Sequence, residues 1–334
     1  MSVPNPVSAL VVGAGVSGAV AARTLAAAGW RVTVMEQNAT RVGGRVCSVR
    51  VGTGLADVGA QQITAREEWF ADLMHDATAA GVARVWTQQM RTAAGEPIGP
   101  AGPRWCGSEA RGMQGIVEWC LDAPRIEVRC GATATSMLRD AGRQWCINES
   151  ADALRADAVI LALPADRSLA LLGAMADAPL RARAAGLRYE PTIAVALELD
   201  QPAALLLPPD ARVVTNHDVL AFVACRRATS LVLLATSAWS HAQLAASDDH
   251  IVRELQHAAA SYVAGARVVA QHVQRWTSGI AHVPPPTDDQ QPFIVVAADY
   301  PPLLLAGAWL ADDRVEAAAR SGRMAAQHLL ECMA

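Results

Sequence analysis

The stretch VSALVVGAGVSG, residues 7–18, decides the fold. Its first half is a short valine-rich run, typical of a buried parallel strand. Its second half is a glycine turn, after which an alanine-rich segment continues to Gly29. Residues 31–36 (RVTVME) then alternate apolar and polar side chains and end on an acid. The order strand, glycine turn, helix, strand, acid predicts a Rossmann-like dinucleotide-binding unit.

Each part of this unit has a chemical reason. Gly13 permits the tight turn, Gly15 lets a pyrophosphate approach the backbone, and Gly18 lets the helix pack on the strand. The helix N-terminus, which carries Ser17, offers N–H groups and a favourable dipole to phosphates. Glu36 would accept hydrogen bonds from ribose hydroxyls. The alternative is a purely structural glycine turn, since such turns are common.

A second glycine turn follows the acid, at Arg41-Val42-Gly43-Gly44-Arg45. Its arginines and backbone N–H groups would reach the same pyrophosphate. An NAD dehydrogenase has no need of this element, although an ordinary loop with solvated arginines is the alternative. The pattern resembles that of the flavin amine-oxidase superfamily, in which R-x-G-G-R follows the acid. This resemblance implies FAD as the cofactor.

The resemblance narrows at residues 56–66 (ADVGAQQITAR), which are similar to a D-x-G-A-Q-Y-x-T stretch of the renalase family, especially its bacterial form. Further similar segments follow in the same order over the whole chain: Arg104-Trp105, Gly112-Met113, Pro191-Thr192, 235–240, Arg275-Trp276, 305–316 and Ser321-Gly322. The resemblance implies an α/β fold with a discontinuous Rossmann-like FAD-binding domain and a second domain of sheet and helices for the substrate. The first would comprise residues 1–70, 103–165 and 286–334, and the second residues 71–102 and 166–285.

Hydrophobic periodicity predicts further elements. Helices are expected over 66–80, around 116–121, over 251–262 and from about 315 to 330; strands are expected over 157–163, 192–199, 231–235, 267–276 and 303–305. A proline-rich loop is expected over 284–291. Asp312-Asp313 offers N-cap chemistry for the last helix. Asp248-Asp249 is interpreted as a solvated helix start rather than a catalytic pair.

The resemblance implies a set of site residues. Those expected to bind FAD are Gly13, Gly15, Ser17, Gly18, Glu36, Gln37, Arg41, Gly44, Arg45, Gln61, Gln62, Ala132, Gly307, Arg314 and Val315. Those expected at the substrate are Thr64, Trp239 and Trp276. The two indoles could form a stacking slot for a flat ring, or they could be plain core. FAD is expected to be non-covalent, since Cys332 lies at the far end of the last helix.

Composition restricts the chemistry. The 334 residues contain 28 arginines and no lysine, which excludes a Schiff-base or P-loop lysine. With a net charge of −4, nucleic-acid binding is not expected. The seven cysteines form no C-x-x-C pair and the histidines show no metal-ligand spacing, so no metal is expected. Without a signal or a membrane-length apolar run, a cytoplasmic protein with no membrane partner is expected.

Renalase-like proteins oxidise the 2- and 6-dihydro isomers of NAD(P)H and pass electrons to oxygen, so the resemblance implies this activity on a small substrate. Two alternatives remain open: a flavin dehydrogenase or amine oxidase of specialised metabolism, and a nucleotide- or flavin-binding protein without turnover. Three departures from the family pattern affect the choice. Ala308 replaces an acid that in the family ordinarily contacts the ribityl chain of the flavin, Gln62 replaces a tyrosine, and Ala317 replaces a glycine.

Overall fold

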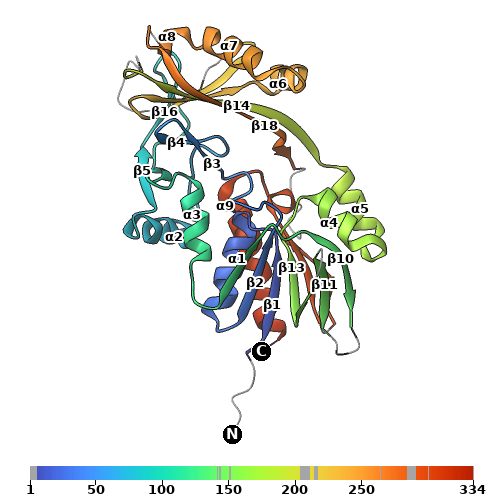
Figure 1. The fold of residues 1–334 in the computed structure, drawn as a ribbon. Coiled ribbons are helices and arrows are strands. Elements are labelled where there is room, and N and C mark those ends of the chain that lie inside the picture. The colour runs from blue at the N-terminus through green and yellow to red at the C-terminus, as the bar shows by residue number, and fades with distance from the viewer. Residues whose placement is uncertain are drawn as a thin grey trace. The chain divides into compact units, whose positions relative to one another are not determined.

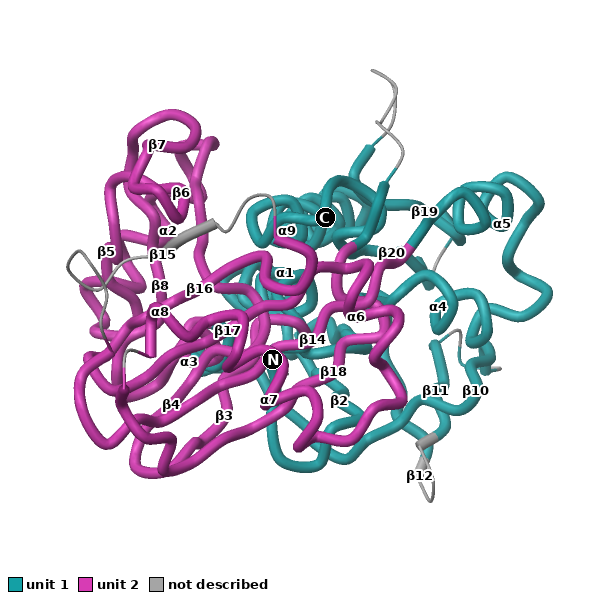
Figure 2. Tube along the Cα trace, turned by 90° about the horizontal axis from the view of Figure 1, so that it is seen from above, with its two compact units in different colours: residues 1–44, 117–188, 281–334 teal, residues 45–116, 189–280 magenta. Residues whose placement is uncertain are grey.

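The computed structural model describes residues 6–140, 142, 144–149, 152–203, 211–213, 217–263, 265–283, 291–299 and 301–333. The chain divides into two compact units, coloured in Figure 2. Unit 1 comprises Met1–Gly44, Val117–Arg188 and Ala281–Ala334, and unit 2 comprises Arg45–Ile116 and Tyr189–Ile280.

Unit 1 is built on a six-stranded sheet that begins with the predicted strand. In spatial order its strands are β19 (Phe293–Ala297), β20 (Leu303–Ala306), β13 (Ala158–Leu161), β1 (Ser8–Val12), β2 (Arg31–Glu36) and β9 (Ile126–Cys130). All neighbouring pairs are parallel except β19–β20. The middle position of β1, between β13 and β2, explains why its residues 9–12 are all buried.

Two long helices and a small second sheet accompany this sheet. Helix α1 (Val16–Ala27) and helix α9 (Val315–Cys332) pack against each other, as Figure 1 also shows. The second sheet is antiparallel and consists of β10 (Ala134–Arg139), β11 (Trp145–Glu149) and β12 (Asp152–Ala156). The remaining helices of unit 1 are α4 (Ala165–Leu172), η1 (Gly173–Met175), α5 (Ala178–Ala185) and η2 (Ala308–Leu310). Helix α3 (Gln114–Leu121) contains the boundary between the units.

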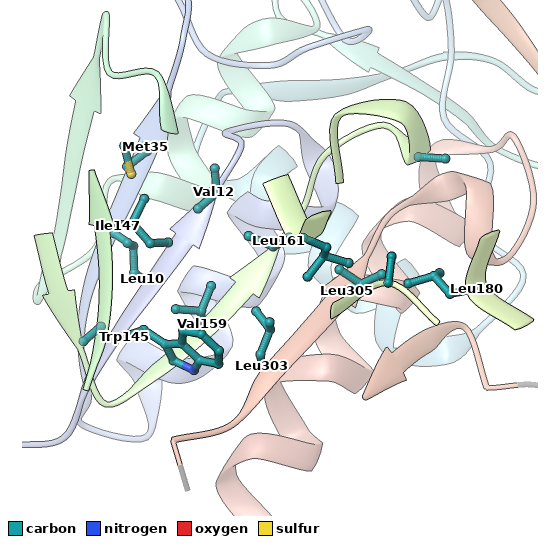
Figure 3. Packing of buried hydrophobic residues seen from close by; sticks show 14 of the residues in the cluster. Leu10, Val12, Met35, Trp145, Ile147, Val159, Leu161, Leu180, Leu303 and Leu305 are labelled. Carbon is teal, nitrogen blue, oxygen red and sulfur yellow. The ribbon is translucent and has the colours of Figure 1, made fainter. Parts of the chain in front are cut away.

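One buried cluster of unit 1 lies where the six-stranded sheet faces the small second sheet. Leu10 and Val12 of β1 pack in the same buried cluster as Trp145 and Ile147 of β11 (Figure 3). The indole nitrogen of Trp145 donates to the carbonyl oxygens of Pro301 and Pro302 at 3.0 Å each, which satisfies its polar atom inside the core. The side chain of Trp145 is thus buried within this core.

Unit 2 is built on a seven-stranded sheet. In spatial order its strands are β18 (Val268–His282), β14 (Arg188–Leu199), β17 (Ser230–Ala235), β16 (Leu220–Arg227), β15 (Ala211–Val213), β6 (Met90–Thr92) and β7 (Pro97–Ile98). Its helices are α2 (Glu68–Ala79), α6 (Ser237–Gln243), α7 (Asp248–Ala258) and α8 (Ala260–Val263), and two-stranded sheets pair β3 (Ser48–Val51) with β4 (Gly54–Asp57) and β5 (Ala83–Thr87) with β8 (Arg104–Gly107). Alternate residues of β14, such as Ile193 and Val195, pack with Leu255 of α7 to form the core.

The predicted helices and strands are present with shifted ends, except that the helix predicted over 251–262 is divided at Ala259 into α7 and α8. The helix start predicted at Asp248-Asp249 is confirmed: both lie in the first turn of α7, which Ser247 caps. The predicted loop over 284–291 lies outside the described residues except for Gln291. The compact units do not follow the predicted domain limits, since 45–70 and 103–116 belong to unit 2 and 166–188 to unit 1. Compactness does not test which parts bind flavin or substrate, so that functional division stays a prediction.

Candidate functional site

The first glycine turn has the geometry that the motif requires. Gly13 adopts a φ of +105°, a conformation that favours glycine, and its N–H donates to the carbonyl oxygen of Met35 at 2.8 Å. A Cβ on Gly18 would lie 1.9 Å from the carbonyl oxygen of Gly13, so only glycine allows this approach. A Cβ on Gly15 would meet nothing within 4 Å. The space beside Gly15 is therefore open to a ligand.

The second glycine turn lies against the first. The N–H of Gly43 donates to the carbonyl oxygen of Ala14 at 2.9 Å, and Gly43 forms a parallel bridge with Gly15. A Cβ on Gly44 would lie 3.6 Å from the Cα of Gly15. The half-buried Arg41 precedes this turn. Two glycine turns separated by about thirty residues thus meet at one place in unit 1.

Glu36 ends β2 beside the first turn. One carboxylate oxygen accepts from the N–H of Ala14 at 3.1 Å, and the other accepts from the N–H of Asn38 at 2.9 Å. Each oxygen keeps a further lone pair, as a ribose ligand needs. The N–H of Ala132 donates to the main-chain carbonyl of Glu36 at 2.9 Å, which places Ala132 next to the acid. The neighbouring Gln37 is exposed.

The start of α1 fits a dinucleotide phosphate. No side chain caps this helix, whose N-cap is Gly15. The hydroxyl of Ser17 is buried and has no hydrogen-bond partner among the described residues. Uncapped helical N–H groups and an unpaired hydroxyl donor beside an open glycine are the groups that phosphate oxygens accept from. The residues present therefore fit the pyrophosphate of FAD.

A third turn of unit 1 follows β20. Gly307 has a φ of +153° and donates its N–H to the hydroxyl of Ser321 at 2.8 Å. The indole N–H of Trp309 donates to the carbonyl oxygen of Leu163 at 3.0 Å, and Ala308 between them is buried. These contacts hold η2 directly after the strand.

Helix α9 begins at Val315, as predicted, but its predicted cap is wrong. The N-cap residue is Arg314 and no side chain caps the helix. Asp312 instead accepts from the Nε of Arg314 at 2.5 Å, because it lies too far before the first turn and meets the guanidinium first. Arg314 also pairs with the buried Glu316 at 3.3 Å. The first N–H groups of α9 therefore have no side-chain cap.

The predicted residues of unit 2 form a separate set. Gln61 is buried, and its side-chain amide donates to the carbonyl oxygens of Asp57 and Gly59. These two acceptors fix the amide orientation, so its oxygen points away and has no partner among the described residues. The side-chain oxygen of Gln62 is also buried without a described partner. Both glutamines thus retain free acceptors.

Arg45 and Thr64 are two further predicted site residues in unit 2. Arg45 donates to the carbonyl oxygen of Gly279 at 3.2 Å, a contact within unit 2. Half-buried Thr64 follows Ile63, which pairs with Trp105 in a β-bridge. Their expected ligand contacts stay predictions.

The structure does not bring Trp239 and Trp276 together. Trp239 of α6 packs on the buried core that also contains α7. Arg275 of β18 donates to carbonyl oxygens of Leu244 and Ala246, between α6 and α7. Since neighbouring strand residues point to opposite faces, Trp276 points away from these helices, and its indole donates to Val58 at 2.7 Å. A stacking slot between the two indoles is therefore not formed.

Sequence reasoning missed two groups of polar residues. Asp57 and Arg226 form a buried ion pair beside Gln61, and Ser321 holds Gly307. Asp57 and Ser321 stood in the segments that carried the family resemblance, which was the only signal available for them. Arg226 is one of 28 arginines and had no distinguishing pattern.

The fold and the paired glycine turns define a dinucleotide-binding α/β protein. Comparison with known families identifies which kind. Residues 83–330 match the family of flavin containing amine oxidoreductases, and residues 11–77 match an NAD(P)-binding Rossmann-like domain. The chain belongs to the flavin containing amine oxidoreductase family. It is an FAD-dependent oxidoreductase, which excludes the alternative of a binding protein without turnover.

Solved structures share the fold at low sequence identity. A protein of Exiguobacterium sp. 255-15 assigned as a protoporphyrinogen oxidase superposes with a TM-score of 0.73 at 15% identity, covering 97% of this chain and 99% of its own. A triple mutant of putrescine oxidase gives 0.72 at 14% identity, with 98% and 99% covered. A fatty acid isomerase from P. acnes gives 0.69 at 11% identity, also with 98% and 99% covered. At these identities the likeness concerns the fold alone.

No helix in the described part of the chain is long and apolar enough to cross a membrane. Among the described residues, no three His, Cys, Asp or Glu side chains gather in a way that could hold a metal ion.

Proposed function

We propose that the chain oxidises a small dihydropyridine-like substrate, of the kind represented by the 2- and 6-dihydro isomers of NAD(P)H. Bound FAD would supply the hydride acceptor and the route of electrons to oxygen. One observation carries the proposal: the chain has no lysine, and thus no amine base beside the flavin. A dihydropyridine needs no base, because its nitrogen lone pair expels the hydride as the ring becomes aromatic. The resemblance of residues 56–66 to the renalase family supports the same substrate class.

In this proposal the residues of unit 1 bind the cofactor. The turns at Gly15 and Gly44, with Arg41, hold the pyrophosphate, and Glu36 binds the ribose. The uncapped start of α9, at Val315, faces the ring edge that becomes anionic on reduction. A helix N-terminus stabilises such a charge by about 0.3–2 kcal/mol.

The residues of unit 2 orient the substrate. The fixed side-chain oxygen of Gln61 and that of Gln62 are acceptors for N–H or O–H groups of cofactor or substrate. Thr64 and Trp276 complete this group. Since the two indoles lie on different faces of the sheet, Trp239 is not required for stacking in this proposal.

A second candidate is an amine oxidase or dehydrogenase of specialised metabolism with another small substrate. The buried Ala308 favours it, together with Gln62, because both residues depart from the renalase pattern at the site. Oxidation of an amine would then have to proceed without the help of a lysine, because the chain has none.

The test is anaerobic bleaching of the flavin absorbance by a panel of substrates. The proposal expects rapid bleaching by 2- and 6-dihydro isomers of NAD(P)H, slow or no bleaching by the 4-dihydro forms and by amines, and recovery of the colour in air. Bleaching by amines alone would favour the second candidate. Bleaching by neither class, with FAD bound, would overturn the dihydropyridine proposal.

FAD is proposed to be held without a covalent bond. Cys332 is exposed and is the last residue of α9, a helix of eighteen residues. It therefore lies at the opposite end of the helix from Val315. Acid precipitation should leave the yellow colour in the supernatant. A yellow pellet would contradict this proposal.

A further inference from the structure

Two adjacent residues of α9, Ser321 and Gly322, each contact a different turn of the proposed flavin site. Ser321 is fully buried. Its hydroxyl accepts a hydrogen bond from the N–H of Gly307 at 2.8 Å and donates one to the carbonyl oxygen of Pro292 at 2.5 Å. The Ser321 hydroxyl thus acts both as a hydrogen-bond acceptor and as a donor.

Gly322 fixes a second distance. A Cβ at this position would lie 1.9 Å from the carbonyl oxygen of Ser17 and 2.7 Å from its carbonyl carbon. These are backbone atoms in the first turn of α1, so they cannot move aside as a flexible side chain would. Helices α1 and α9 thus touch backbone to backbone at the end of α1 that carries the glycine turn (Figure 1).

Neighbouring residues on a helix point about 100° apart, so a single dipeptide can face two different partners. Here one partner is the Gly307 turn and the other is Ser17. Because both contacts come from neighbouring residues of α9, a displacement of the Gly307 turn would be passed to Ser17 through this helix. The dipeptide links the two turns, which lie nearly 300 residues apart in sequence.

We propose that Ser321 and Gly322 are positioning residues that set the spacing between the glycine turn that would hold the pyrophosphate and the Gly307 turn that would hold the ribityl chain of FAD. Neither residue touches FAD in this proposal; both act through Gly307 and Ser17. The inference rests on the placement of FAD in unit 1 proposed above and not on the identity of the substrate.

The test compares S321A, S321C and G322A with a matched control, S8A. Ser8 also donates through its hydroxyl, to Asp157 at 2.7 Å, and accepts from the Asp157 N–H at 3.2 Å. It lies at the start of β1, the opposite end from the glycine turn. Three quantities are measured: the FAD dissociation constant, the midpoint potential of the bound flavin, and the melting temperature of the apoprotein.

S321A is expected to raise the FAD dissociation constant by about 5- to 50-fold, because the buried Gly307 N–H loses its acceptor. Its midpoint potential should shift, since the ribityl chain, and with it the flavin ring, moves relative to the start of α9. S321C, which keeps the shape but bonds weakly, should fall between S321A and the wild type. G322A should also weaken FAD. S8A should lower the melting temperature of the apoprotein without changing FAD affinity or potential.

The inference is overturned if S321A binds FAD within about twofold of the wild type, or if S8A weakens FAD as much as S321A does. If S321A does not fold, S321C against S8A decides in the same way. E36A separates the inference from the placement on which it rests. Unchanged FAD binding in both E36A and S321A would overturn the placement, whereas weakened binding in E36A alone would overturn only the positioning role.

Discussion

Arg226 of β16 and Asp57 at the end of β4 form an ion pair inside unit 2, with side chains 13% and 5% exposed. The same guanidinium donates to the main-chain carbonyl of Gln61. The other carboxylate oxygen of Asp57 accepts from the Ser48 hydroxyl at 2.5 Å and from the Met113 N–H at 2.7 Å. Arg226 therefore fixes both ends of the loop that leads from Asp57 to Gln61.

Replacing Arg226 should lower the free energy of unfolding. R226M leaves the carboxylate of Asp57 buried without its cation, and such a change destabilises by about 3–5 kcal/mol. Urea unfolding of the full-length protein measures the loss of stability. R267M is the matched control, because Arg267 pairs with Asp200 while 81% exposed, and an exposed pair contributes under about 1 kcal/mol. Equal losses in the two variants would contradict the structural role given to Arg226.

This pair also marks the limit of prediction from the sequence. The segment from β1 to β2 was predictable, because its strand, turn and helix are local patterns. Arg226 and Asp57 are 169 residues apart and lie on different sheets, so only the packing of these sheets within unit 2 brings them together. The small sheet of β10 to β12 was missed, since strands such as β10 are largely exposed on one side and carry little hydrophobic signal.

The site was predictable to a similar extent. The positions of Gly13, Gly15 and Glu36 followed from the motif, and their geometry agrees with it. The separation of Trp239 from Trp276 was not predictable, because the face of the sheet to which a strand residue points depends on packing. The capping role of Asp312 failed for a local reason: an arginine two residues later competes for the carboxylate.

E36A should weaken FAD retention while the protein stays folded. The change deletes a charge-assisted hydrogen bond to ribose, which costs about 1.5–3 kcal/mol, or roughly 10- to 150-fold in affinity. Titration of the apoprotein with FAD measures this. Glu127 is an exposed acid of β9, the strand next to β2, so E127A serves as the control and should bind like the wild type. Equal affinity of E36A and the wild type would remove Glu36 as the ribose ligand.

The same variant should change the reactivity of Cys130. Partial burial raises the pKa of this thiol, and the nearby charge of Glu36 raises it further. Removing the charge lowers the pKa, so more thiolate is present at a pH below it. Alkylation of Cys130 at pH 8 should accelerate about two- to threefold in apo E36A. Peptide mapping by mass spectrometry measures the rate, and the exposed Cys332 should react equally in both proteins. A slower Cys130 would contradict the electrostatic argument.

Cys120 offers the opposite case in the same experiment. It is fully buried, and burial raises the pKa of its thiol to about 12. It should stay unmodified at pH 8 until denaturant is added, because both the thiolate and access are lacking. Labelling of Cys120 in the native protein at the rate of Cys332 would show that α3 opens readily.

The last prediction concerns Ala308, where relatives have an acid. Ala308 is buried as the first residue of η2, directly after Gly307. If this turn holds the ribityl chain, A308D adds one charge-assisted bond to a ribityl hydroxyl. FAD should then bind more tightly by about 1–3 kcal/mol, less the cost of burying the carboxylate. The FAD dissociation constant of both proteins, at one pH and ionic strength, measures the change.

A311D is the matched control for A308D. Ala311 is half-buried just after η2, so an acid there adds the same charge to the same segment outside the proposed contact. Tighter FAD binding in A308D alone supports the placement of Gly307 beside the ribityl chain. Weaker binding in A308D, with an unchanged A311D, would mean that the carboxylate meets no partner and that its desolvation dominates. Unchanged FAD binding and unchanged stability in A308D would mean that position 308 faces away from the cofactor, and the role assigned to this turn would have to be withdrawn.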